Sequence, residues 1–253
     1  LYPPDLAHRS IQEAIDILQN PGICIHNAEA IKILAEAGAV INNDKQIALI
    51  PESMVYSALE TVPKKFDLYN LKGEVAVRYD DQHIQFDPGS AAVTLLADET
   101  GHQRPPLTDD YVKFVQLVDA LPAYDAQSTA MVCRDVPDQI SDLYRLFLSL
   151  SLGNKPIITG TFRKESLSIM WEMLCIASGS PQNLEHAPLA VFDVCPTPPL
   201  TWSDLTAQSL IDCARAGIPV ELVSMPLAGA TSPVTLAAAV VQHTAESLSG
   251  LVR

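Results

Sequence analysis

Apolar residues in the first 65 positions recur at helical spacing and are interrupted by turn residues. Ser10 followed by Glu13 has the pattern of a capping box, which predicts that the first helix begins there. Asn27 is expected to cap a second helix that ends at Gly38. We expect helices over 10–20, 27–38 and 51–62, with a short strand at 40–41 and a turn at 42–44. This region is interpreted as a collar or dimerisation element without chemistry of its own.

The pattern changes between residues 66 and 107, where short stretches alternate between apolar and polar side chains. These stretches are Phe66–Tyr69, Val75–Tyr79, His83–Phe86 and Val93–Leu96. Turn residues between them predict small antiparallel hairpins. The segment 87–90 reads as a turn, or as a loop over a pocket.

From residue 108 onward, apolar runs of strand length alternate with helical patterns. Strands are expected at 126–132, 156–160, 189–194 and 220–224, and helices at 138–152, 164–178 and 203–216, after a helix capped by Thr108. Four apolar strands alternating with helices predict a parallel sheet with helices outside it.

The segment from Pro226 to Thr235 joins the last predicted strand to a final helix over 236–248. Ser232 is placed as the N-cap of this helix and Pro233 as its first residue, and Gly229 permits a tight turn. The free N–H groups at such a helix start suit an anion such as a carboxylate. The alternative is an ordinary connection between a strand and a helix.

Composition narrows the class of protein. Hydrophobic residues make up 48% of the 253 positions and charged residues 18%, which supports a sizeable core. The formal charge of −14 argues against nucleic acid and anionic membranes as partners, and it leaves room for a neutral or cationic substrate. Five cysteines without a CxxC pair predict a reducing, cytoplasmic location. Neither a membrane span nor a signal peptide is visible.

Several common chemistries have no motif in this sequence. No phosphate-binding glycine loop and no GxSxG elbow occurs, and the six histidines do not have the spacing of a metal site. Cys195 is the one cysteine expected at a strand end, and it reads as a core thiol. We therefore expect no metal in the site.

Polar and aromatic residues near the predicted strand ends are the candidates for binding. Asp193 and Glu221 lie within strands, where a carboxylate needs either a basic partner or a bound cation as its counter-charge. Phe162, Phe192 and Trp202 could form an aromatic cage for a quaternary ammonium group. Core packing is the simpler interpretation for Phe192, whereas Trp202 is expected in a loop.

Four motifs in order resemble the trimethylamine methyltransferase family, which includes glycine betaine methyltransferases. They are residues 38–42 (GAVIN), 86–90 (FDPGS), 100–104 (TGHQR) with 108–110 (TDD), and the run from Pro226 to Val252. The resemblance implies a TIM (β/α)8 barrel. We then expect a helical region at 1–65, a β-hairpin insert at 66–107, and the first half of the barrel at 108–253, in a chain cut at both ends.

The same resemblance implies methyl transfer from a quaternary or tertiary amine to the Co(I) corrinoid of a partner protein, with no cofactor bound directly. Glycine betaine is the expected substrate and a homo-oligomer the expected assembly. The expected substrate-binding residues are Phe162, Asp193, Trp202, Gly229, Thr231 and Ser232, with no catalytic residue assigned. The open alternatives are a pyrrolysine-type trimethylamine enzyme, a non-catalytic small-molecule-binding barrel, and a lyase or hydrolase that uses Asp193 and Glu221.

Overall fold

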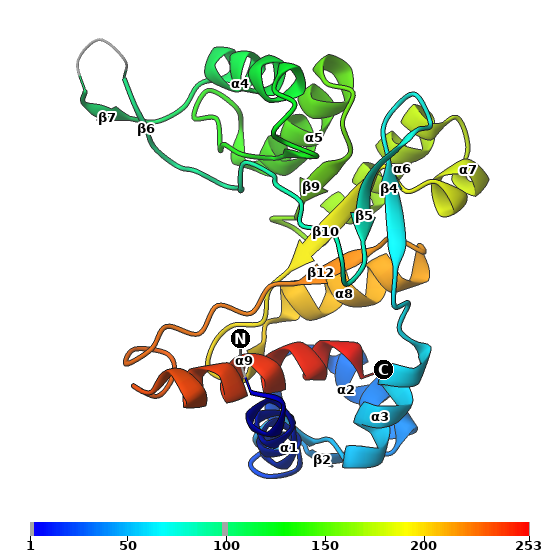
Figure 1. Ribbon diagram of the computed structural model, residues 1–253, viewed down its shortest axis with the longest axis vertical. Helices are drawn as coiled ribbons and strands as arrows, with labels where there is room; N and C mark the ends of the chain where they lie inside the picture. The colour runs from blue at the N-terminus through cyan, green and yellow to red at the C-terminus, as the bar shows by residue number, and fades with distance from the viewer. Residues whose placement is uncertain (1–2, 98–100, 253) are drawn as a thin grey trace. The chain divides into compact units, whose positions relative to one another are not determined.

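The computed structural model describes residues 3–97 and 101–252 (Figure 1). By internal contacts the chain forms two compact units. The first unit contains the residues up to Pro63, 194–211 and those from 222 onward, and the second contains 64–193 and 212–221. The division predicted from the sequence is linear, whereas these units are each assembled from separate stretches of chain.

The first unit packs helices around a small mixed sheet. Its elements are α1 (Pro4–Gln19), β1 (Ile23–Ile25), α2 (Ala28–Ala37), β2 (Val40–Asn42), β3 (Ile47–Leu49), α3 (Glu52–Thr61), β11 (Thr201–Trp202) and α9 (Leu236–Leu251). The strand order is β11-β1-β3-β2, with β1 parallel to β11 and antiparallel to β3. The helix α1 packs on α9. The predicted helical region therefore also contains strands, one of them paired with a distant part of the chain.

Two helix starts in the first unit differ from the prediction. The helix α1 begins at Pro4, which suits a first helical position, so Ser10 is a buried residue inside the helix and not its cap. The helix α9 is capped by Thr235, whose Oγ1 accepts a hydrogen bond from the Ala238 N–H at 3.3 Å, so the prediction of Ser232 as N-cap was wrong. The cap at Asn27 is confirmed, because its Oδ1 accepts from the Ala30 N–H at 2.8 Å.

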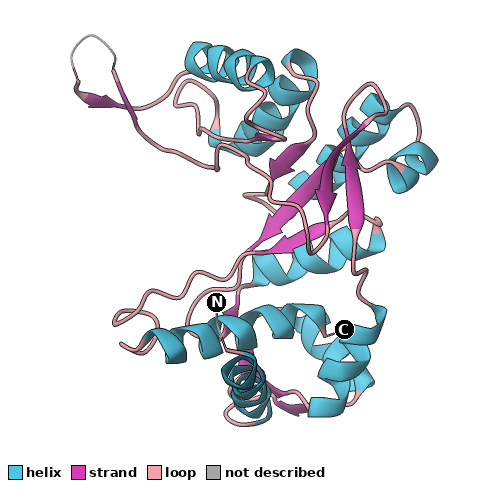
Figure 2. Ribbon diagram, viewed as in Figure 1, coloured by secondary structure: helices cyan, strands magenta, loops and turns pink. Residues whose placement is uncertain are grey.

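The second unit contains a parallel sheet with helices, drawn in magenta and cyan in Figure 2. Its elements are β4 (Phe66–Tyr69), β5 (Val75–Tyr79), β6 (Leu95–Leu96), β7 (Gln103–Arg104), α4 (Thr108–Ala120), β8 (Gln127–Ser128), the 3₁₀ turn Asp138–Ile140, α5 (Ser141–Leu152), β9 (Ile157–Thr159), α6 (Ser166–Ser178), α7 (Pro181–His186), β10 (Ala190–Val194) and β12 (Val220–Leu222). The helix α8 (Asp204–Arg215) has residues in both units, and the last residues of β10 and β12 fall in the first unit.

The parallel sheet has the order β8-β9-β10-β12, and the pairing of β8 with β9 and of β9 with β10 is parallel. Its strands are shorter than predicted. A parallel bridge between Ala92 and Met131 lies beyond β8. The strands of this sheet thus lie side by side in the order in which they occur along the chain. A doubly wound sheet would instead reverse its strand order at one point. The described strands do not close into a barrel, and the TIM barrel stays a prediction.

The hairpin of β4 and β5 is confirmed, whereas β6 pairs with β7, a strand that was not expected from the sequence. The stretch His83–Phe86 forms no strand, so that prediction was wrong. Three cores of described residues lie in this unit, one of them formed by α4, α5 and the segment after β8 through residues such as Tyr111 and Leu148. A second joins the sheet to the helices through residues such as Ile157 and Phe192, and a third joins it to the hairpin through Leu68 and Val77. The hairpin therefore packs with the sheet through a core separate from that of the helices.

Within the described ranges, no helix combines the length and the apolar character that crossing a membrane requires. The longest described helices, α1 and α9, have 16 residues each, which is short of the roughly 20 that a span needs.

Candidate functional site

The strand β10 sends alternate side chains to opposite faces of the sheet. Ala190 and Phe192 belong to the core on the helix side, so the interpretation of Phe192 as a core residue is confirmed. Val191 belongs to the core on the hairpin side. Asp193, two residues later, therefore faces the hairpin side near the carboxyl end of the strand, which is where parallel α/β proteins place their binding sites.

Asp193 lies within electrostatic reach of Asp87 and Glu221, and we call these three residues the acid cluster. Burial raises the pKa of Asp193 to about 7, and the charges of Glu221 and Asp87 add to this effect. Burial, followed by the charge of Asp87, also raises the pKa of Glu221. Asp193 is half-buried, whereas Asp87 and Glu221 are exposed. Asp193 is therefore the enclosed member of the cluster, and its charged form is the most in need of a positive partner.

Aromatic rings lie beside the acid cluster. The ring of Tyr79 stacks on Phe66 with centroids 4.6 Å apart. Burial, followed by the charges of the acid cluster, raises the pKa of the Tyr79 phenol above its usual range. A cavity of about 230 Å³ is lined by Tyr79, Phe86, Asp87 and Glu221 together with Arg78, Asp80 and His83, and Asp193 is not part of its lining. This volume is below the range of drug-sized pockets and suits a small molecule.

None of the ion pairs between described side chains involves the acid cluster. In the part of the chain that the structure describes, no group of three His, Cys, Asp or Glu side chains is arranged to hold a metal ion. A metal needs oxygen ligands that converge to about 2–2.6 Å, whereas an organic cation is held by dispersed charge and aromatic faces. The arrangement therefore favours the counter-charge interpretation of Asp193 and Glu221.

Phe162 is also in the second unit, in the loop after β9. The guanidinium of Arg145 lies 4.3 Å from the centre of the Phe162 ring. The backbone N–H of Phe162 donates to Asp142 Oδ2 at 2.7 Å. Arg145 is only 2% exposed. One face of the Phe162 ring is thus already occupied by a cation of the protein itself, which leaves the other face for any ligand.

The remaining predicted site residues belong to the first unit. Trp202 lies in the strand β11 and not in a loop, is 3% exposed, and donates from Nε1 to Ser249 Oγ at 2.9 Å. Gly229 adopts a φ of 80°, and Thr231 Oγ1 accepts from the Leu227 N–H at 2.9 Å. The role of Gly229, Thr231 and Ser232 in binding stays a prediction, but the helix start that suggested it lies at Thr235.

Sequence reasoning missed a buried carboxyl group in α9 that joins the loops after β10 and β12. Glu246 is 0% exposed and accepts hydrogen bonds from the Leu200 N–H at 2.9 Å, from Gln242 Nε2 at 2.9 Å and from the Ser224 hydroxyl. Gln242 also donates to the Thr231 carbonyl oxygen at 2.8 Å. Glu246 is a charged residue within an otherwise apolar helical pattern, and this pattern could have predicted a buried carboxyl group.

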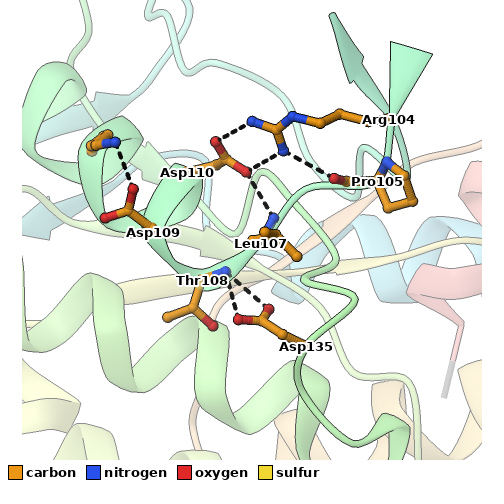
Figure 3. Close-up of polar contacts among 8 residues, drawn as sticks. Arg104, Pro105, Leu107, Thr108, Asp109, Asp110 and Asp135 are labelled. Carbon is orange, nitrogen blue, oxygen red and sulfur yellow. Dashed lines mark hydrogen bonds and ion pairs between the residues drawn. The ribbon is translucent and has the colours of Figure 1, made fainter. Parts of the chain in front are cut away.

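One of the family motifs has a structural role, shown in Figure 3. Arg104 donates two hydrogen bonds, of 2.6 and 2.7 Å, to the carboxylate of Asp110, and this interaction lowers the pKa of Asp110 to about 2. Asp110 also accepts from the Leu107 N–H at 2.8 Å, and Asp135 accepts from the Thr108 N–H at 2.9 Å. The motif therefore fixes the start of α4, where Leu107 and not Thr108 is the N-cap. Thr100, which opens the motif, lies outside the described residues.

Tyr79 and Asp87 were not proposed as site residues from the sequence. Asp87 lies in the turn 87–90, where its Oδ1 accepts from the Gly89 N–H at 2.8 Å. Tyr79 ends an alternating strand and looked like an ordinary hairpin residue. Only the packing of the hairpin with the sheet shows that both lie near Asp193.

Together the parallel sheet and its helices define an α/β protein with an acidic candidate site near the carboxyl end of β10. Residues 4–253 match the sequence model of the trimethylamine methyltransferase (MTTB) family, and the chain belongs to that family.

Curated relatives agree with this assignment. Trimethylamine methyltransferase MttB of Desulfitobacterium hafniense is 25% identical over 238 residues, which are 94% of this chain and 48% of the relative. The enzyme of the same name from Methanosarcina thermophila is 28% identical over 243 residues, which are 94% of this chain and 50% of the relative. A glycine betaine methyltransferase of Desulfitobacterium hafniense is 26% identical over 203 residues, which are 80% of this chain and 42% of the relative. The chain spans about half the length of these relatives.

Proposed function

We propose that the whole protein transfers a methyl group from a quaternary ammonium compound, with glycine betaine as the first choice, to the Co(I) corrinoid of a partner protein. The observation that carries this proposal is the acid cluster, which takes part in none of the ion pairs between described side chains, in a chain that belongs to a methyltransferase family. The order of the parallel strands also supports a (β/α)8 barrel for the whole protein.

The acid cluster supplies counter-charge in this proposal. A quaternary ammonium nitrogen is positive at every pH and cannot donate a hydrogen bond, so carboxylates and aromatic faces are its natural partners. A tertiary amine must first carry a proton to gain the same attraction. The similar identities to trimethylamine and glycine betaine enzymes do not separate the two substrates, and a tertiary amine is also cationic near neutral pH, so the choice of a betaine rests on the resemblance described above.

The transfer itself requires positioning more than proton chemistry. The N–CH₃ bond breaks, its electron pair stays on nitrogen, and the methyl group bonds to the cobalt of the partner, which is a substrate of the reaction. The positive charge on nitrogen disappears in this step. Carboxylates that bind the cation too strongly would therefore slow the transfer. An open cluster, with two exposed members and one half-buried, limits that penalty.

The test uses the whole protein with its reduced corrinoid partner and a panel of glycine betaine, carnitine, proline betaine, choline and trimethylamine. The change in corrinoid absorbance reports methylation, and we expect it with a quaternary amine. Methylation with trimethylamine alone would assign the protein to the pyrrolysine type. No methylation by folded protein and active partner would contradict the proposal and favour a binding barrel.

Substitution of Asp193 separates counter-charge from acid–base chemistry. We expect Asp193→Asn to raise KM for the quaternary amine about tenfold, which corresponds to about 1.4 kcal/mol, and to change kcat only a few-fold. Loss of all turnover with an unchanged KM would instead indicate that Asp193 is a catalytic base, as in a lyase or hydrolase.

A further inference from the structure

The first unit contains a cysteine and a histidine in contact, neither of them a member of the acid cluster. Cys24 lies on β1 and His26 directly follows this strand, so both side chains leave the same face. Cys24 Sγ is 3.6 Å from His26 Nε2, within hydrogen-bond reach for sulfur. The backbone of both residues is held by the neighbouring strand, since the N–H groups of Cys24 and His26 donate to Leu200 and Trp202.

A third residue orients the imidazole. Gln46 Oε1 is 2.8 Å from His26 Nδ1. An amide oxygen can only accept, so Nδ1 is the donor in this contact, and in the neutral imidazole Nε2 is then the acceptor that faces the thiol. Gln46 adopts a φ of 54°, a left-handed conformation that is uncommon for a residue other than glycine, and its carbonyl oxygen accepts from the Ile25 N–H at 2.8 Å. This hydrogen bond fixes the backbone of Gln46, the residue whose side chain orients His26.

We propose that Cys24 is a nucleophilic thiol that reacts with small soft electrophiles, with His26 as its base and Gln46 as the residue that positions His26. A nucleophile, a base within reach and a third group that orients the base form the arrangement that activates cysteine in enzymes. The thiol proton moves to His26 Nε2, the sulfur electron pair forms a bond to the electrophilic carbon, the leaving group departs with its electron pair, and the histidine releases the proton to water. This site is independent of the proposed methyl transfer.

Cys195 provides a comparison within the same protein. Cys24 and Cys195 are both half-buried, while Cys133, Cys175 and Cys213 are buried. Burial raises the pKa of the Cys133 thiol to about 11 and also raises that of Cys175, so these two are expected to react slowly. Cys24 and Cys195 are similar in exposure, so Cys195 controls for access of a reagent, and the change at Cys24 on substitution of His26 measures activation.

The experiment is a time course with iodoacetamide on the folded protein at neutral pH, in which iodide leaves as the S–C bond forms, followed by peptide mapping. We expect Cys24 to be alkylated about tenfold faster than Cys195. His26→Asn and Gln46→Met should each slow Cys24 several-fold and leave Cys195 unchanged, whereas the control His8→Asn, at an exposed position on α1, should change neither rate.

Equal rates at Cys24 and Cys195 in the unmodified protein would overturn the proposal without any variant. An unchanged rate at Cys24 in folded His26→Asn protein would overturn it as well. A rate that falls with His26→Asn but not with Gln46→Met would retain the base and refute the positioning role of Gln46.

Discussion

Asp193→Asn offers a quantitative test of the electrostatics of the acid cluster. Burial and the neighbouring carboxylates raise the pKa of Asp193 from 3.8 to about 7 in the folded protein. A full shift of this size corresponds to roughly 4 kcal/mol against the charged form. Because the side chain is only half-buried, solvent screening lowers this to about 2 kcal/mol. Asparagine has nearly the same shape and carries no charge.

Proton linkage determines whether the charge of Asp193 stabilises or destabilises the folded protein as pH rises. Between about pH 4 and pH 7 the folded protein binds more protons at Asp193 than the unfolded chain, so the stability contributed by this group falls as pH rises. We expect Asp193→Asn to increase the free energy of unfolding relative to the unmodified protein, with a difference that grows by about 1–2 kcal/mol between pH 5 and pH 8. Urea unfolding at several pH values measures it.

The matched control is Asp44→Asn, at an exposed position in the turn between β2 and β3, which should show no comparable dependence on pH. A variant Asp193→Asn that is less stable than the unmodified protein at pH 8 would refute the reasoning. So would a difference that is the same at pH 5 and pH 8, because the gain would then not come from the carboxylate charge.

Four further substitutions at three positions test the packing and hydrogen bonds. Glu246→Ala removes the acceptor of three hydrogen bonds and should cost about 3 kcal/mol in urea unfolding, whereas Glu246→Gln, which keeps an oxygen and the volume, should cost less than about 1 kcal/mol. Gly250→Ala would place a Cβ 2.8 Å from Leu222 Cδ1, so it should destabilise by about 1–3 kcal/mol, and a lower thermal midpoint would report this. Tyr111→Phe loses a buried hydroxyl that bonds Ser149 Oγ at 2.6 Å, and a loss of about 1 kcal/mol is expected from urea unfolding.

Local signals in the sequence predicted many elements of this fold. Asn27 and Gly38 bracket α2 as expected, because a side-chain cap and a left-handed glycine act within a few residues. The alternating pattern of 66–79 predicted a hairpin, and the structure has one. Ser232 failed as a cap because the chain makes another turn before α9, and Thr235 offers the same hydroxyl chemistry three residues later.

The site was harder to predict because it depends on contacts between distant segments. Asp193 was identified as a buried carboxyl group, but its neighbours Tyr79 and Asp87 come from a hairpin and a turn more than 100 positions earlier. Trp202 was expected in a loop because a two-residue strand paired with β1 has no periodicity to detect. The periodicity of a sequence predicts an element and its buried face. It does not predict which elements pack against that face, because this depends on the whole fold.

The most direct test of the acid cluster as a cation site is equilibrium binding of two isosteric ligands to the whole protein. Glycine betaine and 3,3-dimethylbutyrate have the same shape and the same carboxylate, but only glycine betaine carries the positive nitrogen. We predict that calorimetry will show glycine betaine binding at least about tenfold more tightly, and that Asp193→Asn combined with Glu221→Gln will remove most of this preference. Equal affinity for the two ligands, or a preference unchanged in the double variant, would contradict the account.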